Sequence, residues 1–323
     1  MGTRMGPMAW WCTGVRWSGG APALGWFGDG RGERESPLAY GQQLGFVARG
    51  GRRCLGVRRG RRRTACPTGA AVPARASRAQ CEECARIDRS YSVAADTMAD
   101  DPRPYAVYLA YFGPGLVKIG ITADERGSAR LLEQGAVAFT WLGRGPLMAA
   151  RRVEELVGVA LGVPDRIPYT QKRVVRGVLP PAAEWAAELR AAHGRATALP
   201  GWPESLDRAV CEVVDHAGEF GLAGLGHRAQ TASVVREFVD GGVVAGRLVA
   251  AAGPDLHLVV AAGPDLHLVA AAGPDPAPGT GRGLILDTRL LAGWRLEAAA
   301  GETAAGGVTV PVAELGGVQG GLF

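Results

Sequence analysis

Hydrophobic and polar positions alternate over several short stretches near the start of the chain. The alternation runs over residues 10–17, 24–27 and 44–48, and glycine or proline interrupts it between them. An extended strand places successive side chains on opposite faces, so an alternation with period two is typical of β-structure. The pattern predicts short strands in an N-terminal β segment over residues 8–50.

A clearer pattern lies near the middle of the chain, where two alternating stretches flank the loop Gly113-Pro114-Gly115. Residues 105–112 and 116–122 are therefore predicted to form a β-hairpin with a three-residue loop. A loop centred on Pro114 places Tyr108 opposite Gly120. In this register the expected core face carries Val107, Leu109, Tyr111, Val117, Ile119 and Ile121. The other face carries Tyr108, Lys118, Gly120 and Thr122.

The periodicity becomes helical after the hairpin. Residues 129–134 are predicted to form a helix, and residues 137–142 a strand. A second helix begins near Pro146, a residue favoured in the first turn, and ends at Gly162. Further helices are predicted over residues 170–178 and 182–193. Together with the hairpin, these elements define an α/β domain over residues 104–200.

Short strands are predicted again in a C-terminal β segment over residues 201–323, at 213–215, 243–249, 283–286 and 293–296. Within it, at about 248–276, the sequence Ala-Ala-Gly-Pro-Asp-Leu-His-Leu-Val recurs with a ten-residue period. Two tandem copies and a fragment are fewer than a solenoid needs. We interpret the repeat as a duplication that lengthens a hairpin or a loop. The expected fold class is α+β, with β segments at both ends.

Charge is distributed unevenly along the 323 residues. The net charge is only +5, but eight arginines and no acidic residue lie between Arg49 and Arg63. A block of this kind is typical of an arm that binds a polyanion, although a solvated basic loop has the same composition. The block falls within residues 51–90, where little periodicity is visible.

No segment is predicted to enter a membrane. The apolar run over residues 248–272 contains Pro254, Asp255, Pro264 and Asp265, which oppose insertion into a bilayer. We therefore expect a cytoplasmic protein without a membrane partner. In that compartment the six cysteines are expected to be metal ligands, reactive thiols or core residues rather than disulfides.

Four of the cysteines lie close together in the sequence, at Cys54, Cys66, Cys81 and Cys84. Zinc takes four soft ligands in a tetrahedron, and a C-x-x-C turn supplies two of them. We predict a zinc-ribbon-like module with a structural Zn²⁺ over residues 51–90. An unmetallated loop and a redox C-x-x-C pair are the alternatives, but a redox pair normally follows a strand, and none is predicted before Cys81.

Three short stretches of the central domain resemble the GIY-YIG nucleases: Ala106-Val107-Tyr108, Lys118-Ile119-Gly120 and Arg130-Leu131. They occur in the family's order, on a strand, a strand and a helix. The resemblance covers about sixty residues. It implies a nucleic-acid partner, either DNA or RNA, and a GIY-YIG-like β-hairpin and helix core.

In that family, paired tyrosines and a helical arginine handle the nucleophile and the phosphate charge, and a glutamate on a later helix holds a divalent metal. The resemblance thus implies roles for Tyr108 and Arg130, and for Glu154 or Glu155 as a ligand of Mg²⁺ if the protein is catalytic. Lys118 occupies the position of the second tyrosine. A lysine can neutralise a phosphate, but its ordinary pKa of about 10.4 does not suit it to deprotonate water near neutral pH.

The alternative interpretation of the same residues is structural: Tyr108 packs under a helix, Lys118 is solvated, and Glu154 and Glu155 form a polar helix face. Three functions follow. They are a nucleic-acid-binding protein that cleaves phosphodiesters with Mg²⁺, a non-catalytic zinc-containing module that binds RNA, DNA or the ribosome, and a protein-interaction scaffold.

Nearly the whole chain also resembles a family of bacterial proteins known only as a domain of unknown function, and its actinobacterial members most of all. The stretches that carry this resemblance are residues 37–43, 105–110, 117–122, 133–136 and 286–289. It implies that the cysteine-rich and hairpin modules belong together.

Overall fold

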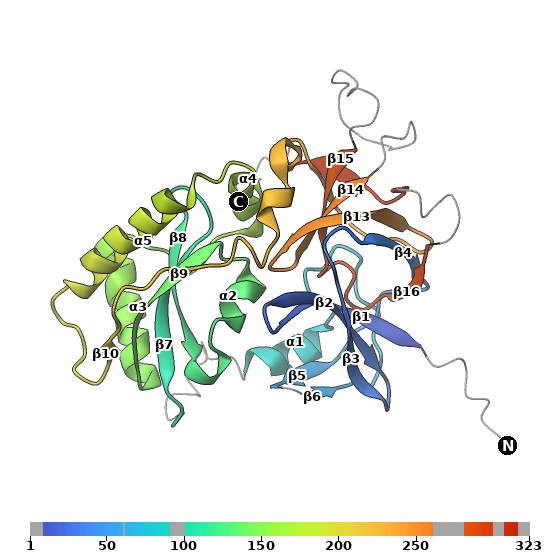
Figure 1. The fold of residues 1–323 in the computed structure, drawn as a ribbon. Helices are drawn as coiled ribbons and strands as arrows, with labels where there is room; N and C mark the ends of the chain where they lie inside the picture. Colours follow the sequence, from blue (N-terminus) through green and yellow to red (C-terminus); the bar gives the residue numbers. More distant parts are fainter. Residues whose placement is uncertain (1–8, 61, 91–100, 261–280, 300–306, 316–323) are drawn as a thin grey trace. The chain divides into compact units, whose positions relative to one another are not determined.

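The computed structural model describes residues 9–60, 62–90, 101–260, 281–299 and 307–315. The chain forms two compact units (Figure 1). Unit 1 combines residues 1–92 with residues 231–323, and unit 2 comprises residues 93–230. Both helices and strands are present, so the predicted α+β class is confirmed.

Unit 1 contains a ten-stranded sheet with the order β17-β12-β15-β14-β13-β4-β16-β1-β2-β3. Its strands are β1 (Trp10–Ser18), β2 (Ala21–Gly28), β3 (Gly32–Pro37), β4 (Gln43–Arg49), β12 (Ser233–Val235), β13 (Val243–Ala252), β14 (Asp255–Val260), β15 (Arg282–Asp287), β16 (Arg295–Ala298) and β17 (Val312–Glu314). The edge strand β3 was not predicted, because its sequence Gly-Glu-Arg-Glu-Ser-Pro has no apolar alternation.

The sheet joins the two ends of the chain, which were predicted to form separate β segments. Strand β4 pairs with both β13 and β16. The C-terminal segment is itself divided between the units, because β10 (Asp207–Arg208) and β11 (Val214–Asp215) pair with a strand of unit 2. Alternation along one strand shows which residues share a face, but it does not identify the strand's partner.

The first copy of the decapeptide repeat forms the tight connection between β13 and β14. Ala252 pairs with Asp255 across Gly253-Pro254. The second copy and the fragment lie outside the described residues. A hairpin at the first copy agrees with our interpretation of the repeat, and the effect of the duplication stays a prediction.

Unit 2 is built around a sheet with β7 at its centre, between β8 and β9. Its longer elements are β7 (Tyr105–Tyr111), β8 (Val117–Ala123), β9 (Ala138–Gly145), α2 (Ala129–Gln134), α3 (Leu147–Leu161), α4 (Tyr169–Arg176) and α5 (Ala182–Thr197). The predicted register is confirmed, since Tyr108 pairs with Gly120. The helix predicted over residues 129–134 is confirmed as well.

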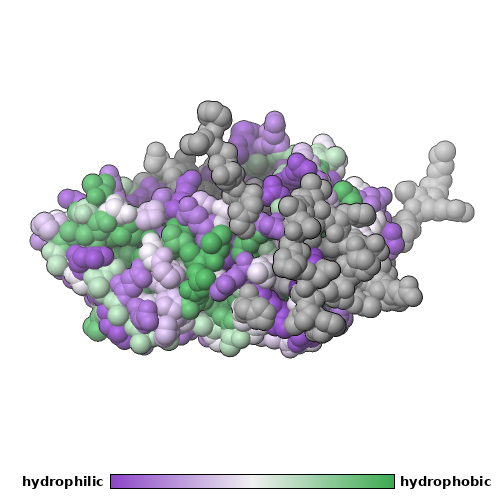
Figure 2. All heavy atoms as spheres, turned by 90° about the horizontal axis from the view of Figure 1, so that it is seen from above, coloured by the Kyte–Doolittle hydropathy of each residue, from purple (hydrophilic) through white to green (hydrophobic). Residues whose placement is uncertain are grey.

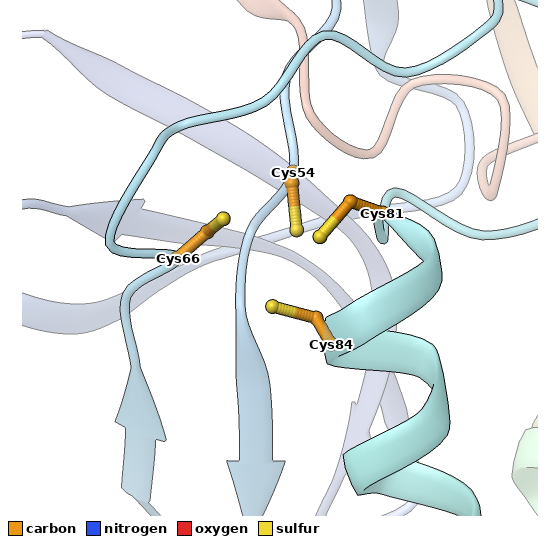
Figure 3. Close-up of side chains that lie close together, drawn as sticks. All are labelled: Cys54, Cys66, Cys81 and Cys84. Atoms are coloured by element: carbon orange, nitrogen blue, oxygen red, sulfur yellow. The ribbon is translucent and has the colours of Figure 1, made fainter.

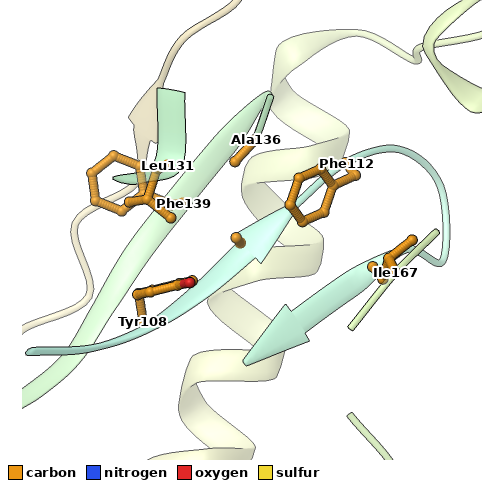
Figure 4. Packing of buried hydrophobic residues seen from close by; sticks show 7 residues of the cluster. Tyr108, Phe112, Leu131, Ala136, Phe139 and Ile167 are labelled. Atoms are coloured by element: carbon orange, nitrogen blue, oxygen red, sulfur yellow. The ribbon is translucent and has the colours of Figure 1, made fainter. Parts of the chain in front are cut away.

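The prediction that one face of the hairpin lies outside the core is wrong. Every residue of β7 is buried, and Lys118 and Thr122 of β8 are buried too. Tyr108 belongs to a core cluster in which it packs with Leu131 of α2 (Figure 4). The other members of that cluster are Ala110, Phe112, Ala136, Phe139 and Ile167. Since α3 and α5 also contact β7, the strand is packed on both faces, and the two faces cannot differ in polarity as they would in a half-exposed sheet.

No helix among the described residues is long and apolar enough to cross a membrane. On the face of the molecule shown in Figure 2, hydrophobic side chains gather in patches between hydrophilic ones. This distribution is ordinary, because apolar atoms contribute much of the surface of folded proteins.

The contact between Tyr108 and Gly120 yields a test of the fold. A Cβ atom at position 120 would overlap the phenol of Tyr108. We expect Gly120→Ala to lower the free energy of unfolding by about 1–3 kcal/mol, because the buried ring must move. Urea unfolding measures this change.

Gly194→Ala is the matched control, because Gly194 is exposed in α5 and a Cβ there meets nothing within 4 Å. It should stabilise the protein by up to about 1 kcal/mol. Equal stability of Gly120→Ala and the wild type would contradict the packing described here.

Candidate functional site

Four thiols of unit 1 converge on one point. The Sγ atoms of Cys54, Cys66, Cys81 and Cys84 all lie within 4.8 Å of one another (Figure 3). All six cysteines of the chain are free of disulfides. The remaining two, Cys12 and Cys211, are not part of this cluster: Cys12 is fully buried and Cys211 is partly buried.

Each thiol is held by a local structure that the sequence encodes. Cys54 precedes β5 (Val57–Arg59) in a turn where Gly56 has φ 78° and its N–H donates to the Cys54 Sγ at 3.3 Å. Strand β5 pairs with β6 (Arg62–Thr64), and this hairpin leads to Cys66. Cys81 caps the helix α1 (Glu82–Arg89), and Cys84 lies in its first turn. Two of the thiols therefore come from a helix start rather than from a second loop.

This arrangement fits a tetrahedral zinc ion. A Zn–S bond of about 2.3 Å implies sulfur atoms roughly 3.8 Å apart, which is within the observed limit. Burial raises the pKa of Cys54 and of Cys84, so thiolates are costly there unless a cation compensates them. A redox C-x-x-C pair would need only two of the four sulfurs.

The arginine block next to the cysteines does not act as one surface. Arg52 is 3% exposed, and its guanidinium donates to five backbone carbonyls. Arg53 lies on the ring of Trp11, with its Cζ 3.3 Å from the ring centroid. These two arginines support the fold, whereas Arg58, Arg59 and Arg62 are exposed.

A second polar cluster lies in unit 2 around the hydroxyl of Tyr108. The phenol ring crosses the backbone at Gly120, where only a glycine leaves room. Gln134 donates from Nε2 to the hydroxyl at 2.9 Å. Lys118 Nζ lies 5.8 Å from the centroid of the Tyr108 ring and donates to the backbone oxygen of Asp165 at 2.9 Å.

Electrostatic effects link these residues to Arg130 and Glu154. Burial raises the pKa of Tyr108, the Gln134 amide and the Arg130 guanidinium lower it, and the Glu154 carboxylate raises it. Arg130 therefore lies close to the phenol, and 46% of its side chain is exposed. Tyr108 comes from β7 and Lys118 from β8, whereas Arg130 comes from α2 and Glu154 from α3. The fold therefore brings together residues that are far apart in the sequence.

Lys118 has a pKa well below the ordinary value for a lysine. Burial, followed by the charge of Arg130, lowers its pKa from 10.5 to about 8, although Glu154 and Asp165 oppose the shift. Only two of the 36 basic residues of the chain are lysines, Lys118 and Lys172. A lysine with this pKa is partly neutral near pH 8, a state that an arginine does not reach.

The structure distinguishes between the two candidate glutamates. Glu154 is half-buried and faces Lys118, and burial together with Asp165 raises its pKa. Glu155 is exposed on α3 and does not join the cluster. Asp165 was not predicted as part of the cluster, since it lies in the connection after α3 and no motif includes it.

A family profile described as "Protein of unknown function (DUF2797)" matches residues 41–263, more than half of the chain. The chain belongs to the DUF2797 family. The match confirms the resemblance to a domain of unknown function, and it includes both the thiol cluster and the polar cluster of this DUF2797 protein. Comparison with curated proteins and with solved structures gave no match.

The thiol cluster of this DUF2797 protein predicts one zinc ion per chain. Cys84→Ser should abolish zinc retention and lower the free energy of unfolding by at least about 3 kcal/mol, because metal binding contributes to folding. Metal analysis and thermal unfolding measure both effects. Cys211→Ser is the control and should retain zinc. The zinc assignment would be contradicted if the purified wild-type protein held no metal and were no more stable than Cys84→Ser.

The shifted lysine can be observed directly, because the chain has only two lysine side chains. In protein labelled with ¹³C at lysine Cε, we expect the signal that Lys118→Arg removes to titrate near pH 8. Burial penalises the charged amine, so the midpoint should lie below the ordinary value. A midpoint above pH 10 would show that Lys118 is solvated.

Proposed function

We propose that this protein binds nucleic acid through unit 2 and cleaves a phosphodiester there with Mg²⁺. The observation that carries the proposal is the convergence of Tyr108, Lys118, Arg130 and Glu154. The resemblance of their motifs to the GIY-YIG nucleases supports the same reaction. In unit 1 we propose that Cys54, Cys66, Cys81 and Cys84 hold a structural Zn²⁺.

The acidic residues fit a magnesium ion. Mg²⁺ commonly binds one or two protein carboxylates and keeps several waters. Glu154 would hold it, because a cation would relieve the repulsion from Asp165 that helps to raise the Glu154 pKa. The bound ion would neutralise charge that develops on the phosphoryl group. Asp165 is the other carboxylate of the cluster, and its charge acts on both Glu154 and Lys118.

The remaining side chains divide the other tasks. Arg130 is exposed and can contact a phosphate oxygen with its guanidinium. Lys118 accepts the proton that the attacking water loses, which its pKa of about 8 allows. Tyr108 is the positioning residue between them, held by Gln134.

Burial favours a second candidate, which is binding without cleavage. Tyr108 is 1% exposed and Lys118 is 8% exposed, so neither is at the surface, whereas Arg130 is. The protein would then be a non-catalytic zinc-containing module that binds DNA, RNA or the ribosome. In both cases binding should weaken steeply with salt, whereas a protein-interaction scaffold has no reason to bind a polyanion.

Cleavage separates these candidates. The wild type should nick labelled DNA or RNA when Mg²⁺ is present, and Arg130→Ala and Glu154→Gln should each lower the rate at least about 100-fold. Glu155→Gln is the matched control and should keep the rate, because Glu155 is exposed outside the cluster. Equal rates for the two glutamate variants would contradict the metal assignment.

The proposed base also sets the pH dependence. The rate should rise about tenfold per pH unit below pH 8 and become constant above it, because Lys118 must be neutral to accept a proton. Lys118→Arg keeps the positive charge but should lose cleavage while retaining binding. A rate that falls as the pH rises would exclude Lys118 as the base. Binding by the wild type without cleavage at any pH would favour the second candidate.

A further inference from the structure

Lys118 supplies an amine in a chain whose other basic residues are nearly all guanidinium groups. All but two of its 36 basic residues are arginines. In the polar cluster, Lys118 Nζ donates to the backbone oxygen of Asp165 at 2.9 Å. An arginine could make this hydrogen bond and could also contact a phosphate, so neither task requires a lysine. A reaction that needs a neutral amine does require one.

The amine is not held by an ion pair. Among the described residues, Lys118 forms no salt bridge, and its hydrogen-bond partner is an uncharged carbonyl. Burial and the guanidinium of Arg130 disfavour the charged amine, and the carboxylates of Glu154 and Asp165 oppose this effect without cancelling it. A lysine that is desolvated next to another cation is typical of an amine nucleophile.

The amine lies at the edge of the unit 2 sheet, beside an exposed connection. Its strand, β8, is the edge strand, and the N–H of Ile119 donates to the backbone oxygen of Pro164 at 3.0 Å. This bond holds the connection between α3 and α4 along the strand. The side chain of Asp165, in the same connection, is 64% exposed. The Lys118 side chain is thus largely covered, but its amine ends at a surface segment.

We propose that Lys118 forms an imine with the C1′ aldehyde of an abasic deoxyribose in DNA, and that the strand is then cut by β-elimination. The inference rests on the proposed function for the class of partner and names a substrate for the same site. An abasic sugar suits a largely covered amine, because it has lost its base and its ring-opened form is a narrow aldehyde chain. Arg130 is exposed beside the cluster and can contact the adjoining phosphate.

The reaction balances without an oxidant or a reductant. The neutral amine of Lys118 attacks C1′, and the carbinolamine loses the aldehyde oxygen as water, so a C=N bond replaces the C=O bond. Glu154, whose charge acts on Lys118, accepts a proton from C2′. The electron pair left on C2′ forms a C2′=C3′ double bond, the bond between C3′ and its oxygen breaks, and the 3′ phosphate leaves. Water then hydrolyses the imine and releases Lys118.

Reduction traps the imine in the full-length protein. The probe is a fluorescent DNA strand with one abasic deoxyribose, incubated with EDTA and sodium cyanoborohydride. We expect a covalent adduct on a denaturing gel, and peptide mass mapping should place it on Lys118. A strand with tetrahydrofuran in place of the abasic sugar has no aldehyde and should give none. Both measurements use the wild type, so they hold even if a Lys118 variant fails to fold.

The chain offers a matched pair of lysine variants. Lys118→Arg should lose the adduct, whereas Lys172→Arg should keep it, because Lys172 lies over the ring of Phe112 outside the cluster. Without cyanoborohydride, Glu154→Gln should still form the imine but slow strand cleavage at least about 100-fold. Glu155→Gln should keep the rate, since Glu155 is exposed outside the cluster.

The two proposals fail in different ways. A wild type that nicks intact nucleic acid with Mg²⁺ but forms no adduct would overturn the inference and leave the proposed function standing. An adduct on Lys118 without nicking of intact strands would do the reverse. An adduct that maps to Lys172 or to the terminal amine would also overturn the inference, because the amine in the cluster would then not be the nucleophile.

Discussion

The ring of Tyr108 occupies the space that a side chain at position 120 would fill. This one contact fixes several features of unit 2 together. It requires the pairing of β7 and β8 in a single register, and it directs the phenol toward α2. The hydrogen bond from Gln134 then holds that helix in place. As a result, Arg130 of the same helix lies beside a hydroxyl that is fixed by a glycine on another strand.

Burial has opposite consequences in the two units. In unit 1, it raises the pKa of Cys54 and of Cys84, and Arg52 fixes the surrounding chain by donating to backbone carbonyls. In unit 2, burial makes Lys118 easier to deprotonate, and Glu154 and Asp165 raise its pKa without cancelling that effect. A metal ion would compensate the thiolates, whereas the lysine can release its proton. The same desolvation thus acts on thiols in one unit and on an amine in the other.

Local patterns were sufficient to predict the hairpin register and the ends of α2, because turn length and periodicity determine them. The four cysteines could also be grouped in advance, since a C-x-x-C turn brings its sulfurs together. Long-range packing could not be predicted. The polar edge strand β3, the pairing of β4 with β13, and the burial of Tyr108 all depend on partners that are distant in the sequence. The choice of Glu154 over Glu155 depends on how α3 is rotated against β8.

The proposed cleavage requires a divalent metal at Glu154, next to Lys118. The most direct measurement is the broadening of the Lys118 ¹³Cε signal by Mn²⁺, a paramagnetic substitute for Mg²⁺. We predict that substoichiometric Mn²⁺ broadens this signal in the wild type and that Glu154→Gln abolishes the effect. Equal broadening in both proteins, or none in the wild type, would contradict a metal site in the polar cluster.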